Sequence, residues 1–545
     1  MSKKHPAPKL LLLTASLVFA SSVWAANADE AEQQEPQGET SINSEKMLEG
    51  FILAPTGESG SPELFLANCA SCHGEQLEGT GIGVPLAGGD LKHGETIDDI
   101  LRAINEGFPA AGMPPWADIL SPTDARQIAL YVTNYRAAQK LAGVAGLSEP
   151  VAIPEAPIAS EVYSVQVEML TPGLHLRPYS IAPLSDGSML LTEKMLGMSI
   201  VAPDGTKSRF ITGTPKVYND SPDMYQGLGW LLDVAPHPDY ANNGWIYLHF
   251  TERCEDCNEL SRAENTPVSM NKVVRGRIKD GAWVDQETIW ETDLANYTYS
   301  TDVGAAGRLA FDDQGHLFFG VGVKSKGFFE GIQDLGQPYG KIFRVNDDGS
   351  IPEDNPFYNT EGALKEIWTL GHRTPEGLEY DPKTGQLWET EMGPMGGDEL
   401  NLLEPGQNYG WPLTSLGLHY DGTAVDHGEE LGVEWNMEDI RQPVLDLTPS
   451  PAVSSFIIYD GDEFPEWKGN LLVANLKAQE LYRFVLEDNQ VVHRETVLQG
   501  LGRIRDIEAD ADGVVYLLLE NVSEGQIVRL TNAGGDAAVE GDMAE

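Results

Sequence analysis

The stretch Leu309–Phe319 reads LAFDDQGHLFF, a short apolar run, an acidic turn with glycine and a second apolar run. Apolar runs on either side of an Asp/Gly turn predict two antiparallel strands joined as a hairpin. The same order recurs five more times in the second part of the chain. The other copies are Ile181–Leu191, Val234–Leu248, Leu378–Trp388, Ile457–Val473 and Ile507–Leu517.

The spacing of these hairpins decides between two all-β architectures. Successive copies begin roughly 50 to 80 residues apart, which suits a four-stranded unit with inserted loops. A β-sandwich would also contain hairpins, but six recurrences favour radial repetition. We therefore expect a mainly β fold over residues 163–532, a six-bladed β-propeller around a central channel.

The residues before the repeats carry a different motif. Cys69-Ala70-Ser71-Cys72-His73 is C-x-x-C-H, the attachment signature of c-type haem, in which two thiols bond the porphyrin and the histidine ligates iron. A zinc site is the alternative, but no second ligand pair follows at a usual spacing. The motif indicates an electron carrier or an electron-accepting enzyme.

Helical patterns surround this motif, and a proline-rich loop lies between the last two of them. Met113 in that loop, about forty residues after the motif, suits a second axial iron ligand, with a core methionine as the alternative. Residues 60–145 therefore resemble a small all-α class I cytochrome c domain. The expected helices begin at Ser61-Pro62, span Thr96–Phe108, and run from Ser121 to about Lys140.

The first residues of the chain predict export. Residues 1–25 have the basic start, the apolar run Leu10–Ala20 and a cleavage site near Ala25 of a secretory signal peptide. The apolar run is too short for a membrane span, so we expect a periplasmic or secreted protein. Residues 26–59 are expected to be a disordered acidic leader, 146–162 a proline-rich linker and 533–545 a disordered tail.

Charge and cysteine usage narrow the partners. The formal net charge of −48 argues against nucleic acid and anionic membrane surfaces as partners. Cys254 and Cys257 form a second C-x-x-C, but Asn258 follows, which excludes a second haem. In an oxidising compartment a short-loop disulfide is favoured over a redox or metal site.

Four cations stand out in this acidic chain because they lie beside the predicted hairpins. Two interpretations of these cations are open. Either they converge at the channel mouth and bind a polyanion, or each forms a salt bridge with a local acid such as Asp506. These cations are Arg373, Lys477, Arg503 and Arg505.

Residues 165–530 resemble the quinoprotein soluble glucose and aldose sugar dehydrogenases, six-bladed propellers that bind pyrroloquinoline quinone (PQQ) and Ca²⁺. The resemblance rests on the segments Gly371–Leu378, Gly393–Leu402, Asn408–Pro412, Gly340–Pro356, Arg503–Asp506 and the surroundings of Lys477. It implies that PQQ is held by Gln226, Arg373, Thr374, Lys477, Arg503 and Arg505, with Thr374 where the family usually has Asn. It also implies a catalytic Ca²⁺ on the carbonyls of Gly393 and Pro394, and a structural Ca²⁺ on Glu399 and the Tyr409 carbonyl.

The chain departs from this family at the catalytic base. Gly304 stands where the family has its base histidine, and Val323 stands where it has the aspartate that orients that histidine. Loss of a positioned base costs on the order of 10²–10⁴ in rate, so another group must act or the chemistry differs. Asp302 is the nearest candidate, with a solvated loop aspartate as the alternative. Glu376 and Glu391 are further candidates, and His316, at a hairpin turn, is expected to be exposed.

The resemblance and the haem motif together predict a periplasmic quinohaemoprotein dehydrogenase. It would oxidise a sugar or related alcohol through PQQ and Ca²⁺ and pass electrons to its own haem c, and from there to a downstream cytochrome or other acceptor. One alternative is a dehydrogenase of a non-sugar alcohol, polyol or aldehyde with a rebuilt base. The other is an inactive propeller that binds PQQ or a sugar beside a cytochrome shuttle.

Overall fold

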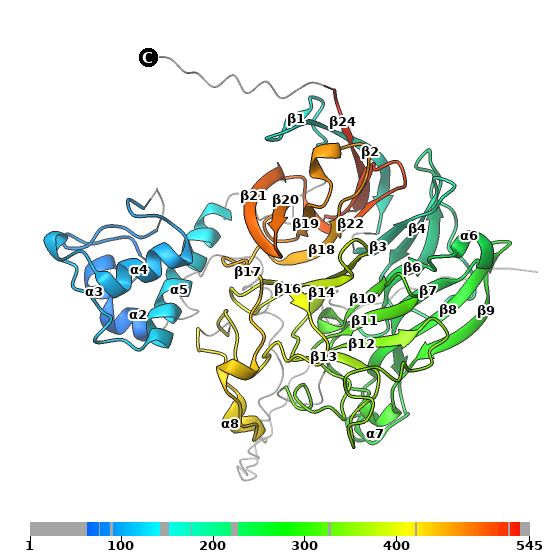
Figure 1. Cartoon of the computed structure of the whole chain (residues 1–545), viewed down its shortest axis with the longest axis horizontal. Coiled ribbons are helices and arrows are strands. Elements are labelled where there is room, and N and C mark those ends of the chain that lie inside the picture. The colour runs from blue at the N-terminus through cyan, green and yellow to red at the C-terminus, as the bar shows by residue number, and fades with distance from the viewer. Residues whose placement is uncertain are drawn as a thin grey trace, which may run out of the picture. The chain divides into compact units, whose positions relative to one another are not determined.

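Six β-sheets make up the chain after residue 152 in the computed structural model (Figure 1). The innermost strand of each sheet contacts the innermost strands of the next and the previous sheet, so the six close into a ring. This is the six-bladed β-propeller that the hairpin repeat predicted. The structure describes residues 63–75, 77–87, 91–141, 152–175, 177–219, 227–324, 329–419, 422–521 and 524–534.

Each blade begins with one of the six predicted hairpins, whose first strand lines the channel. Five blades follow the chain in order. Their strands are β3 (Pro178–Pro183), β4 (Met189–Glu193) and β5 (Gly197–Val201); β6 (Leu231–Pro236), β7 (Ile246–Cys254), β8 (Val268–Lys279) and β9 (Ala282–Trp290); β10 (Ala306–Phe311), β11 (His316–Val321), β12 (Lys341–Asn346) and β13 (Ile367–Leu370); β14 (Pro375–Asp381), β15 (Gln386–Glu391), β16 (Glu399–Leu403) and β17 (Leu445–Asp446); β18 (Val453–Ile458), β19 (Leu471–Asn475), β20 (Glu480–Glu487) and β21 (Gln490–Gln499).

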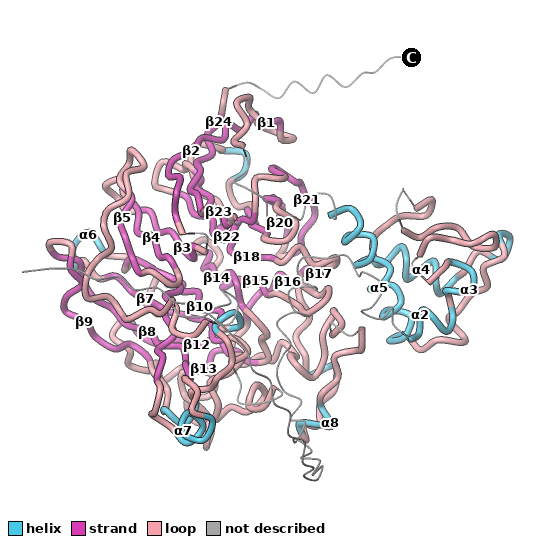
Figure 2. The backbone as a smooth tube through the Cα atoms, turned by 180° about the vertical axis from the view of Figure 1, so that it is seen from behind, coloured by secondary structure: helices cyan, strands magenta, loops and turns pink. Residues whose placement is uncertain are grey.

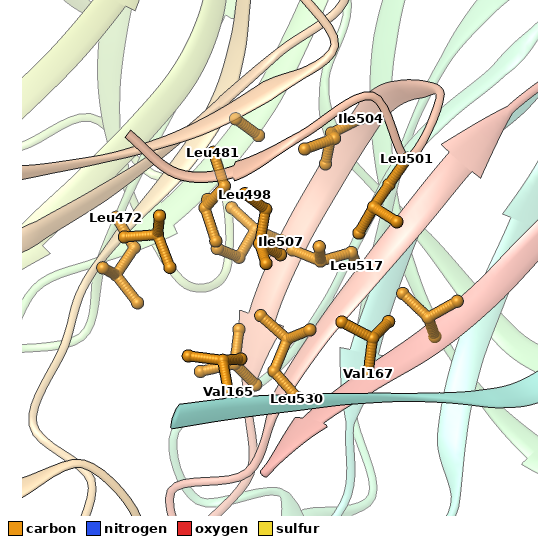
Figure 3. Close-up of a cluster of buried hydrophobic side chains, with 14 of the residues drawn as sticks. Val165, Val167, Leu472, Leu481, Leu498, Leu501, Ile504, Ile507, Leu517 and Leu530 are labelled. Carbon is orange, nitrogen blue, oxygen red and sulfur yellow. The ribbon is translucent and has the colours of Figure 1, made fainter. Parts of the chain in front are cut away.

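The sixth blade joins the two ends of the propeller. Its inner strands come from the C-terminal part of the chain, and β2, the first long strand after residue 152, pairs with β24 on their outer side. Val165, Val167 and Leu530 pack together there without exposure to solvent beyond 2 % (Figure 3). The strands of this blade are β1 (Ile158–Ala159), β2 (Ser164–Leu174), β22 (Arg503–Ala509), β23 (Val515–Glu520) and β24 (Gly525–Asn532).

Short α- and 3₁₀-helices lie in the connections between the strands and do not interrupt the ring of blades. They are α6 (Tyr240–Asn243), α7 (Glu259–Glu264), η2 (Leu294–Asn296), η3 (Asp302–Gly304), α8 (Gly428–Leu431), η4 (Met437–Asp439) and η5 (Pro465–Trp467). Figure 2 shows that strands and loops dominate this part of the chain.

The N-terminal part of the described chain is helical, as expected. Thr96 caps α4 by accepting a hydrogen bond from the Asp99 backbone, and the Ser121 hydroxyl does the same for Asp124 at the start of α5. Phe65 and Tyr131 pack ring to ring 5.1 Å apart in the core. The elements are α2 (Glu63–Asn68), α3 (Ala70–His73), α4 (Ile97–Glu106), η1 (Pro109–Ala111) and α5 (Pro122–Leu141).

Several expectations fall outside the described residues: the signal peptide, the acidic leader, most of the C-terminal tail, part of the linker and Gln226. Within the described ranges, no helix combines the length and the apolar character that a membrane crossing requires.

Candidate functional site

Strand register brings the predicted PQQ and calcium residues to one end of the channel. Arg373 and Thr374 directly precede β14, whose Pro375 pairs with Glu391 at the end of β15, so Gly393 and Pro394 follow at the same end. Lys477 likewise follows β19, whose Asn475 pairs with Val453 at the start of β18. Arg503 and Arg505 lie in the first residues of β22. Radial symmetry places the starts of the innermost strands at one rim.

Arg503 and Arg505 share one buried carboxylate at this rim. Glu520, which has no exposed side-chain surface, lies 3.2 Å from Arg503 Nε and 2.9 Å from Arg505 Nε. Arg177 Nη1 lies 2.9 Å and Lys194 Nζ 3.9 Å from the same group. Burial alone would raise the pKa of Glu520, but the four cations, Arg505 foremost, hold it well below its usual range.

The salt-bridge alternative is thus correct for two of the four cations, but with a different partner than expected. Asp506 instead binds Arg308, with Oδ1 2.7 Å from Nη1.

Arg373 and Lys477 have no carboxylate partner among the described residues. Arg373 Nη1 donates to the Met392 carbonyl at 2.9 Å, and its guanidinium lies 5.4 Å from the centre of the Trp411 ring. No hydrogen bond of the Lys477 ammonium is found in the described part of the chain, and burial lowers the pKa of Lys477 while Asp398 offsets part of that effect. Two cations without a carboxylate ion-pair partner among the described residues fit an anionic cofactor such as PQQ.

The predicted calcium loop is folded tightly on itself. A Cβ on Gly393 would lie 2.2 Å from the Gly396 oxygen and 2.4 Å from the Gly397 oxygen, so only glycine fits there. The Gly393 amide donates to Asp398 Oδ1 at 3.0 Å, and Ser450 Oγ donates to the same oxygen at 2.6 Å. The loop therefore concentrates the hard oxygen atoms that Ca²⁺ prefers.

Glu399 belongs to a buried group of carboxylates on the fourth blade. Asn401 Nδ2 donates to Glu399 at 3.2 Å and to Glu389 at 3.0 Å, and Glu391 pairs with Glu399 across the strands. His372 Nδ1 lies 3.5 Å from Glu391 Oε2 and 4.0 Å from Glu389 Oε1, and the His372 ring stacks on Tyr409.

This group has the properties of a cation site. Within the described residues, His372 Nδ1, Glu389 Oε1 and Asn401 Oδ1 are buried without a hydrogen-bond partner, and no Lys or Arg forms an ion pair with the three glutamates. Burial raises the pKa of Glu391 to about 8 and those of Glu389 and Glu399 well above their usual range. A divalent cation or protons must compensate such buried carboxylates.

The two family base positions lie against each other. A Cβ on Gly304 would come within 2.9 Å of Val323 Cγ2, so the valine side chain occupies the space next to the missing histidine.

Asp302 is buried, so the alternative of a solvated loop aspartate is wrong. Its carboxylate accepts hydrogen bonds from the Gly229 amide at 2.6 Å, Thr251 Oγ1 at 2.5 Å and Ser269 Oγ at 2.7 Å, and it pairs with Lys324 Nζ at 2.5 Å. Four donors occupy the lone pairs that a proton acceptor would need.

The other candidate bases have different surroundings. Glu376 is buried and lies 3.0 Å from Arg505 Nη1, whereas Glu391 Oε2 accepts from the Arg373 amide at 2.6 Å. His316 begins β11 at the hairpin turn, but it is half-buried rather than exposed, because its Nδ1 lies 2.7 Å from Asp312 Oδ2.

The haem motif presents a suitable ligand set. Cys69 and Cys72 are free, half-buried thiols, and burial together with the neighbouring Cys72 raises the pKa of Cys69 to about 11. His73 Nδ1 lies 2.9 Å from the Val84 carbonyl, which leaves Nε2 for iron. Met113 is fixed by backbone hydrogen bonds in both directions with Phe108. These residues fit a covalently attached haem.

Cys254 and Cys257 form a disulfide, as expected. It lies between the end of β7 and the start of α7.

Comparison with known proteins agrees with this architecture. Residues 175–529 match the Glucose / Sorbosone dehydrogenase family, and the chain belongs to that family of oxidoreductases. Residues 60–132 match the family described as Cytochrome C oxidase, cbb3-type, subunit III. The chain is therefore a sugar dehydrogenase-type propeller preceded by a cytochrome c domain.

The individual relatives divide in the same way. Aldose sugar dehydrogenase YliI of Escherichia coli is 32% identical over 68% of this chain and 93% of its own length. Quinoprotein glucose dehydrogenase B of Acinetobacter calcoaceticus is 27% identical over 64% and 84%, respectively. Cytochrome c55X of Paracoccus denitrificans is 34% identical over 15% of this chain and 85% of its own length.

Solved structures match the propeller. The apo-form of the Escherichia coli soluble aldose sugar dehydrogenase has a TM-score of 0.59 at 31% identity, covering 68% of this chain and 99% of that one. The PQQ-bound aldose sugar dehydrogenase of Streptomyces coelicolor, 24% identical with a TM-score of 0.51 over 69% and 99%, shares the fold.

Sequence reasoning missed three contributors to the site. Glu520 and Lys194 come from strand ends with no motif, and only the ring closure brings them to Arg503 and Arg505. Glu389 was also missed, although its two-residue spacing from Glu391 places both side chains on one face of β15. That spacing was the available signal.

Proposed function

We propose that this protein is a quinohaemoprotein dehydrogenase, in which the propeller oxidises an aldose or a related alcohol with PQQ and Ca²⁺. The observation that carries the proposal is that Arg373 and Lys477 have no carboxylate ion-pair partner among the described residues and lie at the same channel rim as Arg503 and Arg505. Two relatives, an aldose sugar dehydrogenase and a quinoprotein glucose dehydrogenase, support the substrate class and the cofactor.

Different residues of the rim would bind PQQ and Ca²⁺. Arg373, Lys477, Arg503 and Arg505, with Thr374 and Gln226, would hold the carboxylates and quinone oxygens of PQQ, and Gly393 and Pro394 would hold Ca²⁺ beside it. When bound, PQQ supplies an acceptor for a hydrogen and its electron pair, polarised by the calcium ion. The chain's own tasks are to orient the substrate carbon and to remove the hydroxyl proton.

The cytochrome domain supplies the electron acceptor. Haem on Cys69 and Cys72, with His73 and Met113 as axial ligands, would take up single electrons and pass them to a downstream cytochrome or another acceptor. Covalent fusion gives the acceptor an effective concentration of roughly millimolar. Export to the periplasm, with cleavage of the signal peptide near Ala25, agrees with covalent haem attachment.

The test is the reduced haem band of purified holoprotein after addition of PQQ, Ca²⁺ and a panel of aldoses, polyols and aldehydes. We expect aldoses to reduce the haem only when PQQ and Ca²⁺ are both present. If polyols or aldehydes reduce the haem and aldoses do not, the substrate belongs to the alternative class of non-sugar alcohols, polyols or aldehydes. A haem that dithionite reduces but no panel member does would overturn the proposal in favour of a binding propeller.

A further inference from the structure

A small cavity lies beside the position of the missing base. Its volume is about 50 Å³, and its walls include Tyr179, Lys194, Trp230, Val303, Glu376 and Arg505. Val303 directly precedes Gly304, so the cavity adjoins the place from which the family's base acts. A space of this size holds a few water molecules or the reacting hydroxyl of a substrate.

Lys194 is the unusual member of this wall. Its side chain is 10% exposed, and no hydrogen bond of its ammonium is found among the described residues. Nζ lies 5.1 Å and 5.3 Å from the ring centres of Tyr179 and Trp230. Two other buried lysines differ: Lys324 donates to three oxygens, and Lys341 donates to the carbonyls of Ile332 and Tyr339. The Lys477 ammonium also lacks a hydrogen bond among the described residues, but it does not line this cavity. Lys194 is therefore the lysine of the cavity wall whose nitrogen is available to a ligand.

Burial favours the neutral form of Lys194. Burial is the largest cause that lowers the pKa of Lys194, Arg505 and Arg177 act in the same direction, and Glu520 and Glu376 offset part of the effect, so that the pKa falls to about 7. The Tyr179 hydroxyl is already engaged, since it donates to the Ala306 carbonyl at 2.6 Å. A substantial fraction of Lys194 is therefore an uncharged amine near pH 7, with a free lone pair.

We propose that Lys194 is the proton acceptor that replaces the family's histidine, a role that rests on the proposed dehydrogenase function. The hydroxyl proton of the substrate passes to the Lys194 amine, which becomes an ammonium ion. The hydrogen on the same carbon leaves with its electron pair to the bound quinone, and the carbon–oxygen single bond becomes a carbonyl. Glu520, at 3.9 Å, stabilises the ammonium ion that forms.

The neighbouring carboxylates are weaker candidates on geometric grounds. Asp302 lines the same cavity, but four donors already occupy its carboxylate. Glu376 is held by Arg505 at 3.0 Å. Asp302 therefore offers no unoccupied lone pair, whereas Glu376 keeps one oxygen without a donor among the described residues and is the alternative that E376Q tests.

The kinetic experiment compares wild type with K194R, K194M, E376Q and the surface control K383M, in PQQ- and Ca²⁺-loaded protein with the best substrate of the panel. In wild type, kcat/KM should rise with pH through an inflection near 7. K194M and K194R should lose this inflection and fall on the order of 10²–10⁴-fold. K383M should keep the inflection in place, whereas E376Q should keep an inflection but move it to lower pH, because Glu376 raises the pKa of Lys194. In a further variant, K194A, small primary amines should restore activity in proportion to their concentration.

A second readout needs no cofactor. In apoprotein labelled with ¹³C-lysine, one resonance that titrates near pH 7 should disappear in K194R, while that of Lys341 remains. Binding of PQQ and the melting temperature, measured for each variant, identify any that fail to fold, and K194R then stands in for K194M.

The outcomes separate the two proposals. If no panel substrate reduces the haem of the wild-type protein, the dehydrogenase function is refuted, and the role of Lys194 is refuted with it. An active wild type whose inflection survives in K194R, or disappears only in E376Q, overturns the role of Lys194 alone and leaves the dehydrogenase intact.

Discussion

A side chain of any size at Gly304 would place its Cβ 2.9 Å from Cγ2 of Val323. The two positions at which the family resemblance places its catalytic pair are therefore in direct contact. We expect G304A to lower the free energy of unfolding of the propeller by about 1–3 kcal/mol, because a branched valine cannot move its methyl group cheaply. Adding V323A should relieve most of that cost, and urea denaturation of the two single variants and the double variant measures the coupling. Strict additivity would contradict the contact.

The buried ion pair of Asp302 and Lys324 is expected to stabilise the folded propeller. Removal of one partner leaves an uncompensated charge, so D302N and K324M should each cost about 3–5 kcal/mol. The double variant should lose less than the sum, since no lone buried charge remains. Chemical denaturation provides the numbers. If D302N left stability unchanged and abolished only turnover, Asp302 would be the base after all.

Strand patterns predicted the fold because they are local, whereas the site depends on contacts between blades. The turn at Asp312–Gly315 and its flanking apolar runs specify a hairpin without reference to the rest of the chain. Arg505 was recognised from its segment, but its partner Glu520 lies at the end of the next strand and Glu376 lies two blades away. Lys194 carries no motif, and its importance arises only from the burial that the closed ring imposes.

The cluster of three buried carboxylates, Glu389, Glu391 and Glu399, makes the stability of the propeller depend on pH and on cations. Burial raises the pKa of Glu391 to about 8, well above about 4.3 in an unfolded chain. The protonated form therefore stabilises the fold fully below about pH 4, and this contribution is lost as pH rises through 8. In EDTA, the melting temperature should fall across this range.

Calcium should largely remove that fall by compensating the charges, and E389Q should weaken both effects. E466Q, on the exposed turn η5, is the matched control and should behave as wild type. Identical melting curves with EDTA and with calcium between pH 5 and 8 would refute a cation site at these residues.

Met113 is expected to set the potential of the haem. A thioether ligand raises the reduction potential, so M113A should lower it while leaving the haem attached to Cys69 and Cys72. Redox titration of the isolated holoprotein measures the shift, and haem-stained denaturing gels confirm attachment. Replacement of the exposed Met437 is the control. An unchanged potential in M113A would mean that another group ligates the iron.

The pairing of β2 with β24 gives synthesis and assembly a fixed order. Among the described residues, the hydrophobic core of the cytochrome domain is made of side chains between Leu64 and Val132, so this domain can form as soon as its own segment is available. The propeller, in contrast, stays an open ring until β24 has been synthesised, because β2 closes the ring by pairing with that last strand. The proposed haem could thus be attached to a folded cytochrome domain before the proposed quinone site, which depends on the closed ring, has formed.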